Sequence, residues 1–266
     1  MNNPTPWHGF SYEPGPIHVE GAVFDDFRLT EHLPAEKAPA VIERDRLFMA
    51  ARPGFNRKLL PLRVDPTSGL AYSGGRYLLD TYENAVEFAR WVTEDFVIDG
   101  TLILDRPDFA EVTAHVWRVI GAYDFTPLET TQKVMRVERF STTGGGHRWL
   151  QSHWAAIRDR AEGVGMASVW LLDNEAQQAA ALVTVADQVT GAQSAEPDFA
   201  SVKALEGKPS LVLDGESSGQ LERVFDRTSW VFTIWRPYRQ GEQSDRALWP
   251  NSPPLPGAPA RVDTAA

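Results

Sequence analysis

The sequence predicts an α+β fold built from two consecutive units, each with the element order strand, helix, strand, strand, helix, strand. Two observations lead to this prediction. Segments rich in β-branched and aromatic residues alternate with segments whose apolar residues recur at helical spacing. The same series of elements then occurs a second time with little residue identity, so the repeat is one of architecture. The length of 266 residues is enough for two small units or one merged domain.

The first unit rests on clear periodic segments. The helix expected after the N-cap candidate Thr81 has apolar residues at i, i+3, i+4 and i+7. The turn at 65–69 joins two strands of a hairpin, and the Pro at position 61 favours an edge strand or a bulge. The expected elements are, in order, a strand at 17–29, a helix containing 38–49, strands at 55–64 and 70–79, a helix after 81, a short strand at 101–104, a helical turn at 107–112 and a strand at 113–123.

The second unit repeats this order after a short polar joint at 124–131. Its expected elements are a strand at 132–140, a helix at 147–162, strands at 166–172 and 178–186, a short helix at 198–206, an irregular stretch at 207–227 and a strand at 229–236. The segment 178–186 is rich in Ala, so a helix is an alternative there. Residues 230, 232 and 234 are expected on one aromatic and aliphatic face.

The element order of each unit is that of the ferredoxin-like βαββαβ motif, used in tandem. We therefore divide the chain into a flexible arm, two ferredoxin-like units and a Pro-rich tail that is expected to be disordered. The boundaries are 1–16 for the arm, 17–125 for the first unit, 131–237 for the second unit and 238–266 for the tail.

Composition excludes several classes of function. The net charge is −10 and no basic stripe occurs, so neither nucleic acid nor an anionic membrane surface is an expected partner. The chain has no Cys, which excludes disulfides, thiolate metal sites, Cys nucleophiles and iron–sulfur clusters. The first residues lack the cationic and apolar regions of a signal peptide, and no run reaches about 18 apolar residues. A cytoplasmic location is the expectation.

The aromatic content is high, with nine Trp, thirteen Phe and six Tyr. These rings either fill the core or form an aromatic-walled pocket for an apolar or aromatic ligand. The sequence contains no HExxH, GxSxG, Walker A or EF-hand motif, and no metal site is predicted. The Gly run at 144–146 lacks the residues of a phosphate-binding loop and is expected to be a flexible entry to a helix.

Two histidines are candidate general bases because imidazole can exchange a proton near neutral pH. His115 and Trp117 share one face of their expected strand, which lies either toward a cavity or toward the helices. In the first case His115 is a base and Trp117 a wall; in the second both belong to the core. His153 leans toward the apolar face of its helix, so it is a base or a core histidine, and Trp154 beside it is a candidate for substrate binding or for the core.

The other candidate site residues also lie on expected strands. Tyr77 either supplies a hydroxyl to a substrate oxygen or is a core residue. Arg136 and Glu138 share one face, as solvent-exposed charges or as a buried pair that binds a substrate carboxylate or phenolate. Trp170 is a candidate for the pocket wall or the core. The acids at 25–26 either mark a strand end exposed to water or place one carboxylate in a polar interior.

One stretch carries a resemblance to a known family. In it, a Gly and a Lys-containing strand lead into an acidic turn, a Gly-Gly strand and a helix with a Thr- and Glu-rich start. The residues are Gly54, Lys58, Asp65, Gly74, Gly75, Tyr77 and 81–91. This stretch, about forty residues of the 266, resembles the small YdhR-type proteins, a family of proposed monooxygenases. The resemblance implies the dimeric α+β-barrel superfamily, with one chain forming a pseudo-dimer.

The resemblance and the aromatic content lead to three functional hypotheses. The first is a cofactor-independent, monooxygenase-like enzyme acting on a small apolar or aromatic molecule. The second is a proton-transfer lyase, cyclase or isomerase, which needs the same base and aromatic wall. The third is a non-catalytic small-molecule protein or a haem protein with His115 or His153 as axial ligand. Whether the chain forms a homodimer stays open.

Overall fold

The protein is described by a computed structural model that covers most of the two expected units. The described residues are 13–35, 37–43, 45–65, 67–127, 133–187, 202, 205–206, 208–213, 219–235 and 237. The predicted tail at 238–266, most of the predicted arm and most of the predicted helix at 198–206 lie outside these residues.

The strands and helices follow the predicted order closely. In the first half they are β1 (Gly15–Pro16), β2 (Gly21–Leu29), α1 (Ala38–Glu43), α2 (Arg46–Ala50), β3 (Phe55–Val64), β4 (Ala71–Leu79), α3 (Tyr82–Arg90), η1 (Trp91–Asp95), β5 (Val97–Ile98), β6 (Thr101–Leu102), η2 (Ile103–Asp105) and β7 (Phe109–Asp124). In the second half they are β8 (Lys133–Thr142), α4 (Gly146–Gly163), β9 (Ser168–Asn174), η3 (Glu175–Gln177), β10 (Ala179–Asp187) and β11 (Leu221–Trp235).

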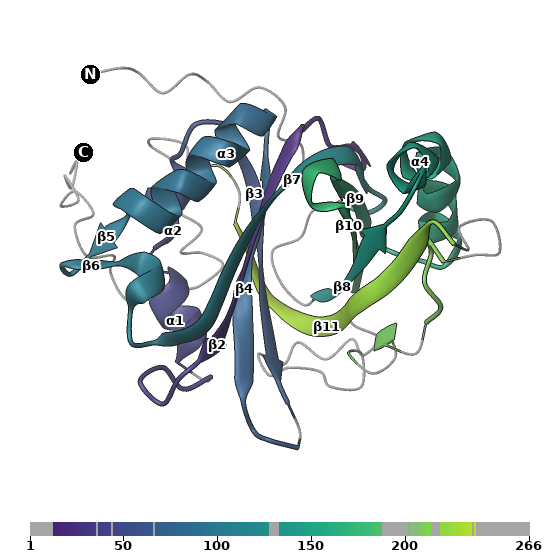
Figure 1. Cartoon of the computed structure of the whole chain (residues 1–266). Coiled ribbons are helices and arrows are strands. Elements are labelled where there is room, and N and C mark those ends of the chain that lie inside the picture. Colours follow the sequence, from purple (N-terminus) through teal and green to yellow (C-terminus); the bar gives the residue numbers. More distant parts are fainter. Residues whose placement is uncertain are drawn as a thin grey trace, which may run out of the picture.

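Eight long strands form a closed barrel. The strand order is β7-β2-β4-β3-β11-β8-β10-β9, all neighbours are antiparallel, and β9 pairs back onto β7. Figure 1 shows the barrel between α3 on one side and α4 on the other. Closure leaves none of the eight strands as a free edge.

Each half of the barrel has the ferredoxin-like order. In the first half the fourth strand of the motif, β7, lies beside the first, β2, and the third strand β4 separates β2 from β3. In the second half β11, β8, β10 and β9 repeat this arrangement. The halves meet at two seams, β3 with β11 and β9 with β7, so the predicted tandem pseudo-dimer is confirmed.

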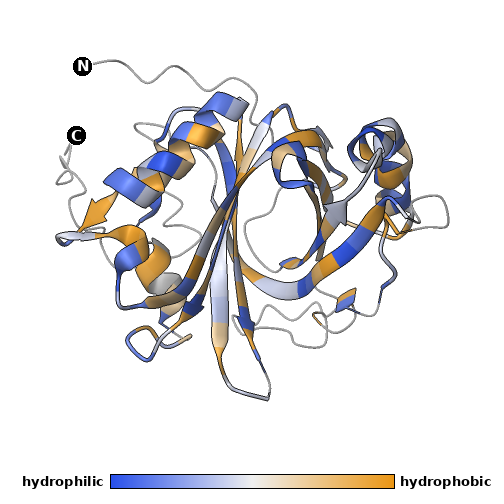
Figure 2. Cartoon of the chain, in the orientation of Figure 1, coloured by the Kyte–Doolittle hydropathy of each residue, from blue (hydrophilic) through white to orange (hydrophobic). Residues whose placement is uncertain are grey.

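Both faces of most barrel strands are buried, which gives three apolar cores. One core lies between the first four strands and α1 to α3, one lies inside the barrel, and one lies between the last four strands and α4. Successive side chains of a strand point to opposite faces of the sheet, so each strand contributes to two cores. In β9, Trp170 and Leu172 point into the barrel while Val169 and Leu171 point toward α4. Figure 2 shows apolar and polar residues on both α3 and α4, as expected of helices covering a sheet.

The structure corrects four details of the sequence prediction. The helical turn expected at 107–112 is largely strand, since β7 begins at Phe109, and the irregular stretch at 207–227 ends where β11 begins at Leu221. The single helix expected around 38–49 is two short helices, α1 and α2. Residues 230, 232 and 234 do not share one face, because the strand register shifts between Val231 and Thr233. Ile234 lies inside the barrel, whereas residues 230 and 232 belong to the core under α1 to α3.

Within the described residues, no helix is long and apolar enough to cross a membrane.

Candidate active site

The barrel interior is lined mainly by apolar side chains. They come from all eight long strands, because each strand directs every second residue inward. The buried residues are Ile17, Ala22, Phe24, Leu59, Leu78, Trp117, Ala122, Met135, Val137, Trp170, Leu172, Ala181, Val183, Val185, Val231 and Ile234. Polar groups interrupt this lining at the two ends of the barrel, and these ends are the places where chemistry can occur.

His115 and Trp117 lie on the inward face of β7. In the register with β2, His115 is opposite Phe24 and Trp117 is opposite Ala22, and these partners belong to the barrel interior. The ring centroids of His115 and Trp117 are 6.1 Å apart, and those of Phe24 and Trp117 are 5.9 Å apart. Of the two faces that the sequence left open for this pair, the structure thus selects the interior.

Two properties of this pair suit a reaction. Burial, followed by the positive charge of Arg139, lowers the pKa of His115 below the usual value of a histidine. The imidazole is therefore neutral at neutral pH and able to accept a proton. The indole Nε1 of Trp117 is buried, and no group among the described residues accepts its hydrogen bond. An unpaired buried donor is costly, so it is a natural partner for a ligand oxygen.

Next to His115, three arginines surround one carboxylate. Arg76 and Arg139 each form an ion pair with Asp26, and Arg227 Nη1 lies 3.8 Å from Asp26 Oδ1. Asp26 lies inside because it is two positions from the inward-facing Phe24 on β2 and shares its face. Its neighbour Asp25 points toward the helices. We call these four residues the arginine cluster.

The charges in the arginine cluster act strongly on one another. Burial raises the pKa of Asp26, but the positive charges of Arg76 and Arg139 outweigh it, so the net shift is downward. Burial lowers the pKa values of Arg139 and Arg227, and the charge of Arg76 contributes in the same direction. One carboxylate thus faces three guanidinium groups at this end of the barrel.

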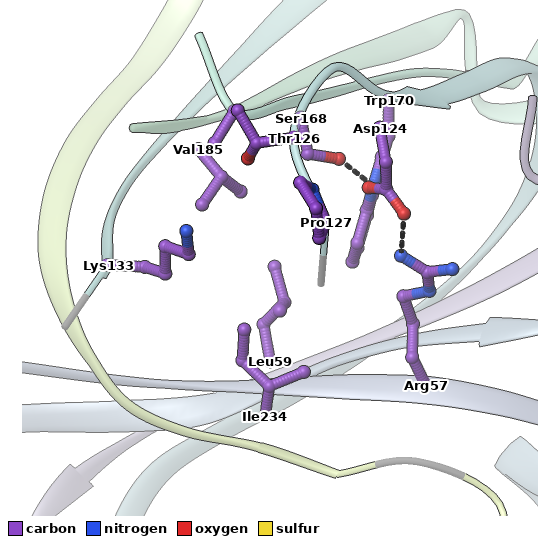
Figure 3. Close-up of a pocket in the computed structure, with 11 residues that line it drawn as sticks. Arg57, Leu59, Asp124, Thr126, Pro127, Lys133, Ser168, Trp170, Val185 and Ile234 are labelled. Atoms are coloured by element: carbon purple, nitrogen blue, oxygen red, sulfur yellow. Dashed lines mark hydrogen bonds and ion pairs between the residues drawn. The ribbon is translucent and has the colours of Figure 1, made fainter. Parts of the chain in front are cut away.

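The opposite end of the barrel holds a small cavity (Figure 3). Arg57 Nη1 and Asp124 Oδ2 form a buried ion pair there at 2.6 Å. Trp170 Nε1 donates to Ser168 Oγ at 3.1 Å, and Lys133, paired with Asp187, lines the wall. The free volume is about 20 Å³, which is room for one water molecule and not for an aromatic substrate.

Tyr77 lies outside the barrel, beneath the helices of the first unit. Its hydroxyl lies 3.4 Å from the sulfur of Met49, and its ring carries the ammonium group of Lys58 at 4.6 Å. Burial, followed by the charge of Asp25, raises the pKa of Tyr77 well above its usual value. Because alternate residues of β4 point to opposite faces, Arg76 is inward and Tyr77 is not.

Arg136 and Glu138 form a buried pair on the outer face of β8. Their side chains approach to 3.4 Å, and Arg136 also donates two hydrogen bonds to Asp226 of β11, at 2.8 and 2.7 Å. Arg223 completes the group with a 3.0 Å contact to Glu138. These contacts link two neighbouring strands, and they lie on the α4 side of the sheet, away from His115.

His153 and Trp154 both lie on α4, outside the barrel. The His153 ring stacks on Trp149 with centroids 4.2 Å apart, and its Nδ1 lies 2.8 Å from the carbonyl oxygen of Trp149. Trp154 lies directly over Gly121 of β7, where a side chain would meet the indole ring. The structure thus brings His115, Trp117 and Trp170 into the barrel and leaves the other five predicted site residues outside it.

Sequence reasoning missed most of the charged residues at the barrel ends. Of the arginine cluster, the sequence indicated only Asp26, as one of the two acids at 25–26. It did not indicate Arg57, Asp124 or Lys133 at the other end. The available signal was a charged residue at alternate positions of an apolar strand, as in Arg57 beside Leu59. It also missed a hydrogen-bonded group at the start of α4, where His147 Nε2 lies 2.7 Å from Thr142 Oγ1 and Nδ1 contacts Asp173.

In the described part of the chain, no three His, Asp or Glu side chains are grouped as a metal site would require.

The chain matches no family model and no curated protein sequence. Its fold is shared with solved structures. A proposed monooxygenase from Fusobacterium nucleatum subsp. nucleatum superposes with a TM-score of 0.52 at 11% identity, over 82% of this chain and 94% of that one. A proposed monooxygenase from Lactobacillus acidophilus gives 0.42 at 10% identity, over 82% and 95%. An anthrone oxidase-like protein gives 0.47 at 13% identity, over 83% and 94%.

The Fusobacterium structure covers both halves of the barrel, and at this identity the likeness concerns the fold. The barrel topology agrees with it: two ferredoxin-like halves meet at two antiparallel seams. The chain therefore has the dimeric α+β-barrel fold, with both halves supplied by a single polypeptide.

Proposed function

We propose that the protein is a cofactor-independent, monooxygenase-like enzyme that oxidises a small apolar or aromatic molecule with dioxygen at the end of the barrel that holds His115. The observation that carries this proposal is the half-buried His115 on the inward face of β7, next to the buried indole N–H of Trp117, which has no acceptor among the described residues. The fold shared with a proposed monooxygenase is consistent with it and does not by itself identify a substrate.

His115 is the general base in this proposal. A neutral imidazole accepts a proton from an acidic C–H or O–H group of the substrate and leaves an electron-rich anion. The lowered pKa keeps His115 unprotonated at neutral pH, so the base is ready before substrate binds. The positive charges of Arg76 and Arg139 near the same site favour the substrate anion once it forms.

The substrate anion is the reductant. For a methylene group the overall reaction converts R–CH₂–R′ and O₂ into R–CO–R′ and H₂O. One oxygen atom enters the new carbonyl group, the other leaves in water, and all four electrons come from the substrate and its C–H bonds. The Trp117 N–H is placed to donate to a developing oxygen anion, and the apolar lining around Phe24 restricts access of bulk water.

The test is oxygen uptake with a panel of phenols, quinols and activated methylene compounds, using the full chain. His115→Gln is expected to lower kcat at least about 100-fold, the usual contribution of a general base. Trp117→Phe keeps an aromatic ring and removes the donor, so it is expected to lower kcat about tenfold or more. His153→Gln is the matched control, because that ring lies on α4 outside the barrel, and its kcat is expected to stay within about twofold.

Two results would contradict the proposal. Oxygen uptake that is equal in the wild-type protein and in His115→Gln would remove the base from the mechanism. Substrate proton exchange or isomerisation that depends on His115 without oxygen uptake would replace the oxygenase by the proton-transfer enzyme. An absorbance spectrum of the purified protein, with and without added haem, tests the cofactor-free part: a Soret band that shifts in His115→Gln would assign haem chemistry instead.

A further inference from the structure

We propose that the arginine cluster is a binding site for an organic anion, and that the substrate of this enzyme carries a carboxylate-type headgroup that the cluster holds. The inference deepens the proposed function, because it names the chemical class of the substrate. It rests on the charges and burial of four residues, Asp26, Arg76, Arg139 and Arg227, and on a donor without an acceptor among the described residues in each of Arg76 and Arg139.

The charge balance of the cluster is the first argument. In the described part of the chain, Asp26 is the single ion-pair partner of Arg76, Arg139 and Arg227. Within the part of the chain that the structure describes, three guanidinium groups share one ion-paired carboxylate, which leaves the cluster with an excess of positive charge. A bound anion would offset this repulsion, and a carboxylate fits the paired N–H groups of a guanidinium.

Two buried N–H donors of the cluster have no acceptor among the described residues. The Arg76 side chain is 2% exposed, and its Nε finds no hydrogen-bond acceptor among the described residues. The buried Nε of Arg139 is likewise without an acceptor in the described parts. Buried guanidinium donors are normally satisfied, so these groups indicate an acceptor that the chain itself does not provide.

The arginine cluster is open to solvent on one side and lies close to His115. Arg139 and Arg227 are 17% and 26% exposed, so a ligand can reach them from solvent, while Arg76 lies deeper against the ring of Phe24 at 4.9 Å. His115 and Arg76 are the register partners of Phe24 on its two neighbouring strands, so the base lies two strands away from Arg76 at the same level of the barrel. An anion held by the arginines would therefore place an attached carbon framework toward the base.

Aromatic surfaces around the guanidinium groups suit an organic anion better than an inorganic one. The Phe225 ring lies 4.8 Å from the guanidinium carbons of both Arg139 and Arg227, and the Tyr72 ring lies 4.9 Å from that of Arg227. These rings fix the orientation of the arginines and provide apolar area for the ligand body. The matching ligand is a small aromatic monocarboxylate.

The test is isothermal titration of the full-length protein with benzoate and with its uncharged isostere benzamide. Benzoate is expected to bind with a stoichiometry of one, and benzamide at least about tenfold more weakly, since charge-assisted hydrogen bonds are lost. Arg227→Gln is expected to weaken benzoate binding about tenfold or more. Arg90→Gln, on the exposed face of α3, is the matched control and is expected to leave the affinity unchanged.

Asp26→Asn gives the proposal a second, opposite signature. It removes the carboxylate that competes for the guanidinium groups, so benzoate is expected to bind more tightly by about tenfold. A circular dichroism spectrum identical to that of the wild-type protein establishes that this variant is folded. A role of the cluster in stability alone predicts no gain in affinity, and that result would overturn the proposal.

The remaining outcomes separate this inference from the proposed function. Equal binding of benzoate and benzamide, no benzoate binding, or equal effects of Arg227→Gln and Arg90→Gln would overturn the anion site, even if uncharged phenols support oxygen uptake. Benzoate binding that follows the expected pattern, together with no oxygen uptake from any compound, would support the anion site and refute the oxygenase.

Discussion

Charged residues inside the barrel are arranged so that each end has its own electrostatic character. At one end Arg57 and Asp124 neutralise each other at 2.6 Å, both almost fully buried. At the other end Asp26 faces three arginines and leaves positive charge in excess. A neutral pair needs no ligand, whereas an unbalanced cluster attracts one. This difference is the reason why we propose binding at the His115 end and a structural role at the Arg57 end.

The buried pair of Arg57 and Asp124 gives a prediction about stability. Asp124→Ala leaves the guanidinium of Arg57 buried without its carboxylate, so the free energy of unfolding is expected to fall by about 3–5 kcal/mol. Urea denaturation measures this change. Arg158→Ala, which breaks an exposed contact with Asp159 on α4, serves as the control and is expected to have no measurable effect. Equal effects of the two substitutions would refute a structural role for the buried pair.

The lowered pKa of His115 predicts a particular dependence of stability on pH. The unfolded state takes up the proton near the ordinary value of about 6.5, and the folded state takes it up only at lower pH. Stability from this group is therefore complete above about pH 6.5 and is lost as the pH falls below that value.

His115→Gln removes this component. The difference in unfolding free energy between the wild-type protein and the variant is expected to shift in favour of the variant between about pH 7.5 and about pH 5.5. Denaturation curves across this range measure the difference. A difference that stays constant with pH would show that His115 titrates normally in the folded protein.

At the scale of elements, a close contact between two backbones positions α3 on the sheet. Strand β2 begins directly under the first turn of α3, and Gly21 is the residue that allows it. A Cβ at this position would lie 2.5 Å from the Ala85 Cβ and 2.7 Å from the Thr81 carbonyl oxygen. The absence of a side chain at position 21 therefore sets the distance between the first helix-covered sheet and α3.

Gly21→Ala is expected to lower the free energy of unfolding by about 1–3 kcal/mol, because backbone atoms of α3 would have to move. Thermal or urea denaturation measures the loss. Gly163→Ala, at the end of α4 with open space around it, is the matched control. It is expected to be neutral or to stabilise the helix by up to about 1 kcal/mol. The same loss in both variants would exclude the close approach as the cause.

At the scale of the whole molecule, the two seams join the halves into one core. Side chains from β2, β4 and β7 of the first half pack inside the barrel against those from β8, β9 and β10 of the second. Neither half can bury its inward face without the other. The halves are therefore expected to unfold together, although the element order is that of two separate motifs.

Leu172→Ala tests this coupling. Leu172 is fully buried inside the barrel on β9, so its truncation is expected to cost about 2–5 kcal/mol of unfolding free energy. Hydrogen exchange measured by mass spectrometry is expected to speed up in β2 and β4 of the first half as well as in β10. Faster exchange confined to the second half would show two independent domains.

The sequence by itself determined the order and type of nearly all elements. Helical and strand periodicity depends on residues a few positions apart, so it can be seen in a single segment. Even the Ala-rich stretch at 178–186 is the strand that was predicted, as β10. The same periodicity showed that His115 and Trp117 share a face, and it made one of the two acids at 25–26 a candidate for the interior, which Asp26 is.

The tertiary structure alone decided which face became the barrel interior. Most barrel strands are buried on both faces, so the usual contrast between an apolar and a polar side is missing, and alternation does not reveal which set points inward. The interior also holds pairs such as Arg57 with Asp124 and Asp26 with Arg139, whose partners are 67 and 113 positions apart. Such contacts are fixed by the packing of the whole barrel and leave no local periodic signal, and a bulge in β11 moved Ile234 to the other face.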